Sequence, residues 1–424
     1  MRNRKGRNFR FEMLEGRACL AAAASVTTGN LTITDDVAAD LVVTQTAADT
    51  WTVTDGGNPV GAGTFTGVTG NVTIKTSAAD DSIAVVLTGQ TAPKCVIVDA
   101  KGGANEVSVT GGTIAQTLDL KAGAGDDTFT VDGVTVNGLT QINTGNGNNT
   151  LVLSNGGSKS LHIVTGSGDD TTTIGDGTSP YSVTGTTRIN DNGGPNDVVT
   201  VASGATLGNL QTTAVNSLTL AAGSDLTGSV SFSGGYNTAN QLTLEGTVDG
   251  SIYMYGSGGT DTLTSTAGSV VGGSVSAYSS SGDDNFDLAG TILGSAYLDT
   301  GAGIDAVTLG GQVGNRVWAW LGSGADFFEL TGKIGVAPGT TSRLTLDAGT
   351  GNDQVALRAG SEVNGTATIN MGAGDDELAV DDTALIIAAL FSGGSGSDKY
   401  YGTLPRTGVT QVSLETLLVI APPF

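Results

Sequence analysis

The sequence predicts an all-β fold: a single-stranded parallel β-helix solenoid of about fifteen coils, each of ~23 residues with three short strands. Three observations support this fold class. Gly accounts for 67 of 424 residues while Pro accounts for only 8, which excludes a collagen or polyproline chain. Alternating stretches of about 3–5 residues are separated by Gly and Asn, a pattern typical of short strands and tight corners. No long stretch has the periodicity of a helix.

One motif, first seen as KAGAGDDTFTV at residues 121–131, recurs along the chain with steps of 19 to 27 residues. We call the second acidic residue of each copy, or the Asn in its place, the anchor. An apolar residue follows two positions after every anchor, except after Asp170, where Thr172 stands. A looser copy is centred on Asp49. The fifteen anchors are Asp81, Asn105, Asp127, Asn149, Asp170, Asp197, Asn216, Asn240, Asp261, Asp284, Asp305, Asp326, Asp353, Asp376 and Asp398.

Residues 136–156, VNGLTQINTGNGNNTLVLSNG, illustrate a single repeat. A strand-like LTQIN leads into the Gly-rich corner TGNGNN, the strand TLVL follows, and a further Gly corner ends the repeat. Many repeats add a short third stretch, such as GTIAQ at 112–116. Such a repeat cannot bury its own apolar face, so stability must come from stacking on neighbouring coils. At ~4.8 Å per coil, fifteen coils form a rod roughly 70 Å long with the anchors in one column.

The repeat also sets the expected domain boundaries. Residues 76–402 form the β-helix repeats, and residues 26–75 form a less regular N-terminal β cap with the first coils. The apolar segment 403–424, which ends in LETLLVIAPPF, is expected to be a C-terminal cap. Caps are needed because exposed ends of a solenoid invite pairing with other chains.

The segment RNFRFEMLEGRACLAAA (7–23) resembles the F-E-x-L-E-x-R leader common on large secreted and surface proteins of planctomycete bacteria. Phe11, Glu12, Leu14, Glu15 and Arg17 match that pattern. The resemblance implies that residues 1–25 are an export leader, disordered or removed, and that the protein is secreted or located at the cell surface.

The G-x-G-x-D-x-apolar core, as in GAGDDTF (123–129) and GTGNDQV (349–355), resembles the glycine- and aspartate-rich nonapeptide of secreted RTX calcium-binding proteins. In that family tandem motifs face each other and sandwich Ca²⁺. Here the motif occurs once per coil, so the second facing turn is missing. The alternative is purely conformational, because Gly permits positive φ and Asp or Asn bonds its own backbone in tight corners. Should Ca²⁺ bind, the candidate ligands are Asp261, Asp284, Asp305, Asp326, Asp353, Asp376, Asp398, Asp127 and Asp170.

Charge limits the classes of partner. The formal net charge is −23, although residues 1–17 carry six basic residues against two acidic ones. A polyanion of this kind repels nucleic acid and anionic lipid but attracts cations. No apolar run approaches the roughly 18 residues of a transmembrane span. We therefore expect a monomer that has no transmembrane segment and does not bind nucleic acid, with cell-surface or matrix components, among them carbohydrate, as candidate partners.

The residues needed for catalysis are scarce. His162 is the single histidine, and the two cysteines, Cys19 and Cys95, lie far apart, so neither a zinc pattern nor a hydrolase triad is present. We expect no enzymatic activity. The alternative is a carbohydrate-active β-helix, a polysaccharide lyase or hydrolase, which would use a carboxylate pair as acid and base. Its candidate pairs, all periodic, are Asp80–Asp81, Asp126–Asp127, Asp169–Asp170, Asp283–Asp284 and Asp375–Asp376.

Aromatic residues gather in VWAWLGSGADFFEL, residues 317–330. Strand alternation places Trp318 and Trp320 on one face, where they are either a contact patch for carbohydrate or another partner, or part of the core. The overall expectation is a non-enzymatic secreted or cell-surface repeat protein with a structural or adhesive role. The sequence leaves open whether its stacked Asp corners are also stabilised by Ca²⁺ or only turn the chain.

Overall fold

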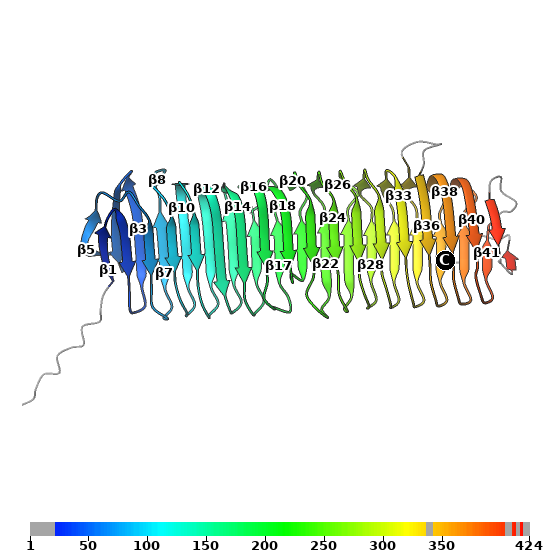
Figure 1. Ribbon diagram of the computed structural model, residues 1–424, viewed down its shortest axis with the longest axis horizontal. Coiled ribbons are helices and arrows are strands. Elements are labelled where there is room, and N and C mark those ends of the chain that lie inside the picture. Colours follow the sequence, from blue (N-terminus) through cyan, green and yellow to red (C-terminus); the bar gives the residue numbers. More distant parts are fainter. Residues whose placement is uncertain (1–21, 336–341, 403–408, 413–415, 419–424) are drawn as a thin grey trace, which may run out of the picture.

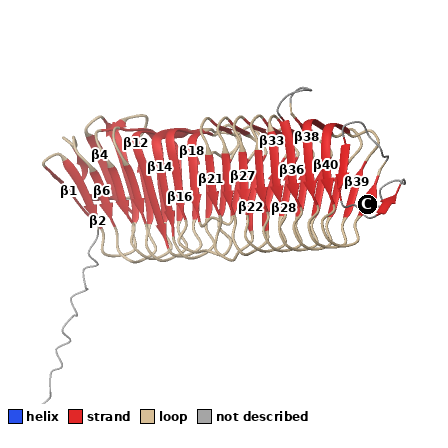
Figure 2. Ribbon diagram, turned by 45° about the vertical axis from the view of Figure 1, so that its right-hand side comes forward, coloured by secondary structure: helices blue, strands red, loops and turns tan. Residues whose placement is uncertain are grey.

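The computed structural model describes residues 22–335, 342–402, 409–412 and 416–418, and within them the chain is a parallel β-solenoid of about fifteen turns (Figure 1). The predicted fold class is confirmed. Each turn contributes strands to three parallel faces, and Figure 2 shows the corners of successive turns aligned in a row along one edge. Residues 1–21 of the expected leader and most of the expected C-terminal cap lie outside the described residues, whereas Ala23–Ser25, which the prediction included in the leader, belong to a strand, β1 (Ala23–Thr27).

The first face holds the strands that follow the anchors. It runs through β3 (Asp40–Ala47), β7 (Ser82–Val86), β10 (Glu106–Ile114), β12 (Thr128–Gly145), β13 (Thr150–Ser154), β15 (Thr171–Ile174), β17 (Val198–Val201), β19 (Ser217–Leu220), β22 (Asn240–Leu244), β25 (Asp261–Ser265), β28 (Asn285–Leu288), β31 (Ala306–Leu309), β34 (Phe327–Leu330), β37 (Gln354–Leu357), β39 (Glu377–Val380), β41 (Lys399–Tyr401) and β43 (Thr416–Leu418).

The second face consists of the shortest strands. It comprises β8 (Thr91–Ala92), β20 (Asp225–Leu226), β23 (Thr247–Val248), β26 (Val270–Val271), β29 (Thr291–Ile292), β32 (Gln312–Val313) and β35 (Lys333–Ile334), together with parts of longer strands. The third face runs through β2 (Asn30–Thr34), β6 (Val72–Lys75), β9 (Val96–Asp99), β11 (Leu118–Lys121), the end of β12, β14 (Gly156–Thr165), β16 (Tyr181–Asn190), β18 (Thr206–Thr213), β21 (Val230–Ser233), β24 (Ile252–Tyr255), β27 (Val275–Tyr278), β30 (Ala296–Asp299), β33 (Arg316–Trp320), β36 (Ser342–Asp347), β38 (Glu362–Asn370), β40 (Leu385–Ser392) and β42 (Val409–Val412).

The core is a continuous stack of inward side chains, because alternate residues of each short strand point inside. Every residue two positions after an anchor is buried, from Ile83 to Tyr400. Thr172 is buried among them as the one polar member. Strands pair in register from coil to coil, so that Val307 lies between Phe286 and Phe328. This register makes each coil depend on its neighbours for burial, as the repeat predicts.

The N-terminal strands differ from the repeats in direction. β1 (Ala23–Thr27) pairs antiparallel with β2, and β3, β4 (Thr50–Asp55) and β5 (Asn58–Phe65) form an antiparallel meander around the buried Trp51. Asp49 lies in the turn of that meander, so the looser copy there is not a coil corner. Asp40 pairs with Ser82, and Ala39 therefore occupies the position equivalent to the anchor. At the other end β42 and β43 pair parallel with β40 and β41 and continue the faces.

Candidate functional site

The fifteen anchors form one buried column at the edge where the corners lead into the first face, as the sequence predicts. We call it the anchor column. All fifteen side chains are at most 5% exposed. They include the nine candidate calcium ligands, two of which, Asp127 and Asp170, lie in the N-terminal half. Ca²⁺ binding by these residues remains a prediction.

Hydrogen bonds join the anchors into a ladder. The backbone N–H of one anchor donates to Oδ1 of the anchor in the next coil: Asp305 N to Asp326 Oδ1 at 2.8 Å, and Asp326 N to Asp353 Oδ1 at 2.9 Å. The same bond recurs from Asp81 to Asn216 and again from Asp261 to Asp398. Between these runs, Asn240 instead accepts the N–H of Gly235 in its own corner. The exception has a reason, because the N–H of Asn240 donates to the backbone oxygen of Thr260 at 3.2 Å and needs no side-chain acceptor from the next coil.

Five anchors are preceded by an aspartate, which points outward and accepts hydrogen bonds from the next coil rather than from the preceding one. Asp283 Oδ1 accepts the N–H of Ile304 in the next coil at 2.8 Å, and Asp375 Oδ1 accepts that of Ser397 at 2.9 Å. These outer residues are exposed whereas the anchors are buried. The five acidic pairs are therefore divided, with one carboxylate inside the solenoid and one outside. Four of the outer carboxylates accept a corner N–H, and the fifth, Asp169, accepts the side-chain amide of Asn196.

The anchor column carries unpartnered oxygens. Oδ2 accepts no hydrogen bond in ten anchors: Asp81, Asp127, Asp170, Asp197, Asp284, Asp305, Asp326, Asp353, Asp376 and Asp398. Burial disfavours the charged form and raises the pKa of Asp261, Asp305, Asp326, Asp353 and Asp376 from 3.8 to about 6. Asn anchors carry no charge, and their side-chain amide has a donor in place of the unpartnered oxygen. Asn105 Nδ2 donates to Gly103 O at 3.0 Å and to Asp127 Oδ1 at 2.8 Å.

We expect Asp353→Asn to raise the free energy of unfolding at pH 7.5 by about 1–2 kcal/mol. The amide keeps the Oδ1 acceptor for the N–H of Asp326 and puts a donor where Oδ2 now lacks a partner. The reverse change, Asn105→Asp, should lower stability by a similar amount. Urea denaturation of both variants in EDTA measures the two effects. A loss of stability in Asp353→Asn would contradict this account.

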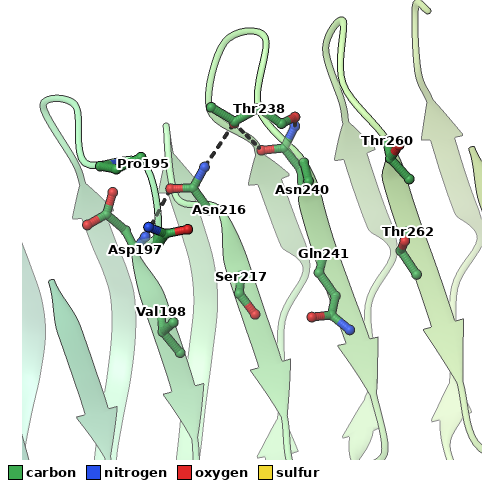
Figure 3. Close-up of a pocket in the computed structure, with 12 residues that line it drawn as sticks. Pro195, Asp197, Val198, Asn216, Ser217, Thr238, Asn240, Gln241, Thr260 and Thr262 are labelled. Atoms are coloured by element: carbon green, nitrogen blue, oxygen red, sulfur yellow. Dashed lines mark hydrogen bonds between the residues drawn. The ribbon is translucent and has the colours of Figure 1, made fainter. Parts of the chain in front are cut away.

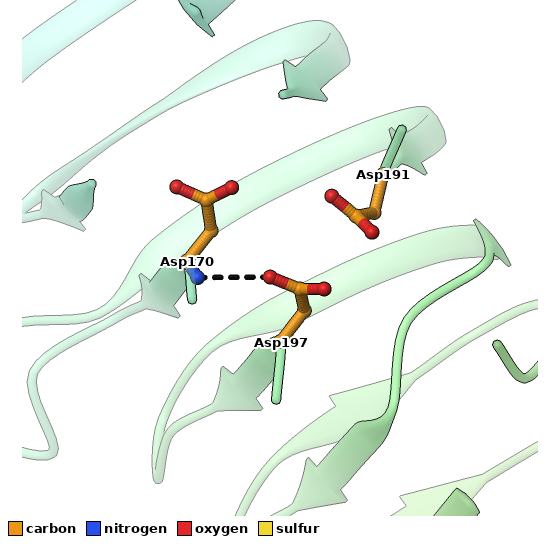
Figure 4. A group of neighbouring side chains, drawn as sticks. All are labelled: Asp170, Asp191 and Asp197. Carbon is orange, nitrogen blue, oxygen red and sulfur yellow. Dashed lines mark hydrogen bonds between the residues drawn. The ribbon is translucent and has the colours of Figure 1, made fainter. Parts of the chain in front are cut away.

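Three carboxylates meet at one place on the column (Figure 4). One oxygen each of Asp170, Asp191 and Asp197 lies within 4.8 Å of the others, and all three residues are buried. Within the described ranges no other group of three potential metal ligands is this close. Sequence reasoning included Asp170 and Asp197 as anchors but missed Asp191, which is out of register. The only signal was the unusually long step of 27 residues from Asp170 to Asp197.

A groove lies beside these carboxylates (Figure 3). The corner before Asn216 has only two residues between β18 and that anchor, whereas the neighbouring corners 191–196 and 234–239 are longer. The short corner leaves a notch over Asn216, with adjoining recesses of about 710 and 520 Å³ that share Pro195 and Thr238. Asn216 Nδ2 donates to Thr238 Oγ1 at 2.8 Å within it. Asp191 lines the smaller recess.

The third face carries an outward cluster that we call the aromatic platform. Strand register places Tyr253, Tyr297 and Trp318 in one column, with Ser276 between the first two. Tyr255, Tyr278 and Trp320 form the adjacent column, with Asp299 between the last two. Tyr297 and Trp318 stack at 4.6 Å, and Arg316 lies 5.6 Å from the Trp318 ring centre.

The prediction that Trp318 and Trp320 share a face is confirmed. Both point outward, with Trp320 41% exposed, while Val317 and Ala319, which alternate with them along the strand, are buried. Of the neighbouring phenylalanines, Phe328 is in the core. His162 is half-buried on β14, where its Nε2 lies 3.3 Å from Asn190 Nδ2.

Comparisons with protein-family models, with curated proteins and with solved structures found no significant match. Among the described residues, no helix is long and apolar enough to cross a membrane. The chain is a repeat protein with a β-solenoid fold, and its function has to be inferred from the corners and the outward faces.

Proposed function

We propose that this protein is a non-enzymatic structural and adhesive rod of the cell surface or its matrix, and that the aromatic platform contacts carbohydrate. The platform is the single observation that carries this proposal. Except for Tyr236, every Tyr and Trp among the described residues that is not buried belongs to it. Such a concentration on an otherwise Thr-, Ser- and Gly-rich surface favours a contact role, because large exposed aromatic patches on soluble proteins mark interaction sites.

The arrangement of the platform suits a sugar ring. Asp299 lies between Tyr278 and Trp320 in register, so the two rings stand two coils apart, about 9.6 Å. That spacing leaves room for a ligand above Asp299, with an aromatic side chain on either side and a carboxylate to accept hydroxyl hydrogen bonds. Burial raises the pKa of Asp299. The strongly acidic chain disfavours an anionic polysaccharide, so the expected ligand is a neutral glycan.

Rigidity supports the structural part of the proposal. The corners, like the strands, are hydrogen-bonded from coil to coil, as in Ser323 N to Gly301 O at 2.9 Å and Thr350 N to Gly322 O at 2.8 Å. A rod with bonded faces and bonded corners is suited to span distance and hold a binding face in place. The alternative, a carbohydrate-active enzyme, requires two carboxylates facing one substrate. The division of the acidic pairs between inside and outside favours the non-enzymatic function.

Binding to neutral glycans tests the proposal. The full chain should be retained by an insoluble neutral polysaccharide such as cellulose or chitin, or by neutral glycans on an array. Replacing Tyr278 and Trp320 together by Ala should reduce retention by roughly tenfold or more, since aromatic side chains contribute most of the binding energy in such contacts. Tyr236→Ala is the matched control, because Tyr236 is 85% exposed but lies outside the platform.

Two results would count against the adhesive role. One is the absence of binding by the unmodified chain to any neutral glycan tested. The other is an equal loss of binding in Tyr236→Ala and in the platform variant. Release of soluble sugar from the polysaccharide by the unmodified chain, abolished in a variant of one outer and one anchor aspartate, would favour the enzymatic alternative.

A further inference from the structure

The corner between β16 and β17 is unlike the other corners of the solenoid. It begins at Asp191, ends at the anchor Asp197, and faces the anchor Asp170 of the preceding coil (Figure 4). Each of the three carboxylates offers one oxygen within 4.8 Å of the others. Two adjacent coils therefore contribute three negative charges to a single buried volume.

Part of this cluster is held in place by hydrogen bonds. Asp191 Oδ1 accepts from Thr165 Oγ1 at 2.8 Å, and its Oδ2 accepts from the N–H groups of Gly193 and Gly194 at 2.9 and 3.2 Å. Asp197 Oδ1 accepts the N–H of Asp170 at 2.8 Å. These bonds fix the carboxylates before any ligand arrives, so the cluster is preorganised.

Two oxygens of the cluster are left without a partner. Asp170 Oδ2 and Asp197 Oδ2 are buried and accept no hydrogen bond, and the two side chains are only 3% and 2% exposed. Figure 4 shows the Asp191 carboxylate turned toward those of Asp170 and Asp197. None of the ion pairs between described residues involves these three aspartates. A buried carboxylate without a hydrogen bond or a counter-charge is costly, and a bound cation supplies what is missing.

We propose that Asp170, Asp191 and Asp197 bind one divalent cation per chain, with Ca²⁺ preferred. The donors are all oxygens, which suits a hard cation. Ca²⁺ accepts six to eight ligands in irregular geometry, whereas Mg²⁺ demands a near-ideal octahedron. The notch beside Asp191 gives solvent access to the site, so water can complete the coordination shell.

The cation would tie the long corner 191–197 to the coil of Asp170. The corner contains Gly193, Gly194 and Pro195 and projects beside the notch, where the short neighbouring corner gives it little support. Binding at its base would hold both of its ends, because Asp191 and Asp197 are those ends. This inference does not rest on the adhesive function, and its test contains no glycan.

Isothermal titration of the full chain with CaCl₂, after removal of metals with EDTA, measures the site. The expected stoichiometry is one tight site per chain. Asp191→Asn should weaken binding by roughly a hundredfold, because the number of ligand charges sets Ca²⁺ affinity. Asp191 is not an anchor, so this variant keeps the ladder intact. Asp81→Asn is the matched control, since Asp81 is a buried anchor that lies four coils from the cluster and is not one of the nine candidate ligands, so that losing its charge should leave Ca²⁺ affinity unchanged.

Hydrogen–deuterium exchange gives a second readout. Ca²⁺ should slow exchange at residues 191–197 in the unmodified chain but not in Asp191→Asn. Should Asp191→Asn fail to fold by circular dichroism, Asp197→Asn takes its place, because Asn216 already fills the same position in the next coil. Absence of Ca²⁺ binding up to millimolar concentration overturns the proposal. So does a tight site whose affinity is unchanged by Asp191→Asn or by Asp197→Asn.

Discussion

Lowering the pH from 7.5 to 5 should stabilise this protein, with a melting temperature at least about 5 °C higher at the lower pH. The cause is the anchor column. Asp261, Asp305, Asp326, Asp353 and Asp376 have pKa values raised to about 6 by burial. In the unfolded chain the same groups titrate near 3.9. Between about pH 4 and 6 the folded chain therefore binds protons that the unfolded chain does not.

The direction of the effect follows from that difference. A carboxyl with a raised folded pKa destabilises the fold when it is charged, so stability is fully present at low pH and is lost as the pH rises through about 6. A pKa moved from 3.8 to about 6 corresponds to roughly 3 kcal/mol per group. Neighbouring anchors interact, so the total is smaller than five separate contributions. Most soluble proteins instead lose stability as their paired carboxylates are protonated.

Two variants of equal net charge distinguish the effect of the anchor column on the pH dependence of stability from the general effect of a net charge of −23. The first changes the anchors Asp326, Asp353 and Asp376 to Asn. The second changes the outer residues Asp126, Asp283 and Asp375 to Asn, which keeps their Oδ1 acceptors. Thermal melts in EDTA should show a much smaller pH dependence for the first variant and a nearly unchanged one for the second. A melting temperature that falls from pH 7.5 to 5 in the unmodified chain would refute the assignment.

The fold could be predicted from the sequence because the same motif recurs in every coil. A Gly-rich corner followed by an anchor and an apolar residue recurs fifteen times, and stacking such units leaves one regular solution, the solenoid. The same regularity placed all anchors in one column. The first coil, at the N-terminal end of the repeats, was harder to identify from the sequence. Ala39 occupies the anchor position of the first coil, and because alanine lacks the side chain that defines the motif, Asp49 was the closer match.

The candidate sites were only partly predictable, because they depend on register between coils. Alternation along β33 was enough to put Trp318 and Trp320 on one face. Alternation could not predict that Tyr278 and Tyr297 belong to the same platform. They lie one or two coils earlier, and only the pairing of strands between coils places them beside the tryptophans. Asp191 was missed for a related reason. It stands six positions before its anchor, at the start of the corner, whereas the alignment rests on the anchor and the residues directly beside it.

The largest effect of a single substitution is expected at Gly324. Its φ is +149°, and a Cβ at this position would overlap the carbonyl oxygen of Gly303 in the preceding coil. That oxygen belongs to the backbone and cannot move without separating the coils. Gly324 N also donates to Thr350 O at 2.8 Å, so the corner is bonded to the following coil as well. Gly324→Ala should therefore lower the free energy of unfolding by about 4 kcal/mol or more.

Alanine substitutions at two other glycines distinguish the cost of a positive φ from the cost of the overlap with the preceding coil. A Cβ at Gly360 would meet nothing within 4 Å, but φ is +78° there, so Gly360→Ala carries only the conformational cost of about 1–2 kcal/mol. Gly268 has open space as well and no positive φ, so Gly268→Ala should be nearly neutral. Urea denaturation followed by circular dichroism ranks the three variants. If Gly324→Ala proved no worse than Gly360→Ala, the contact between corner backbones would not be what limits these positions to glycine. If the ranking holds, the glycines of the G-x-G-x-D motif are required by the close stacking of coils, independently of any ligand that the aspartates bind.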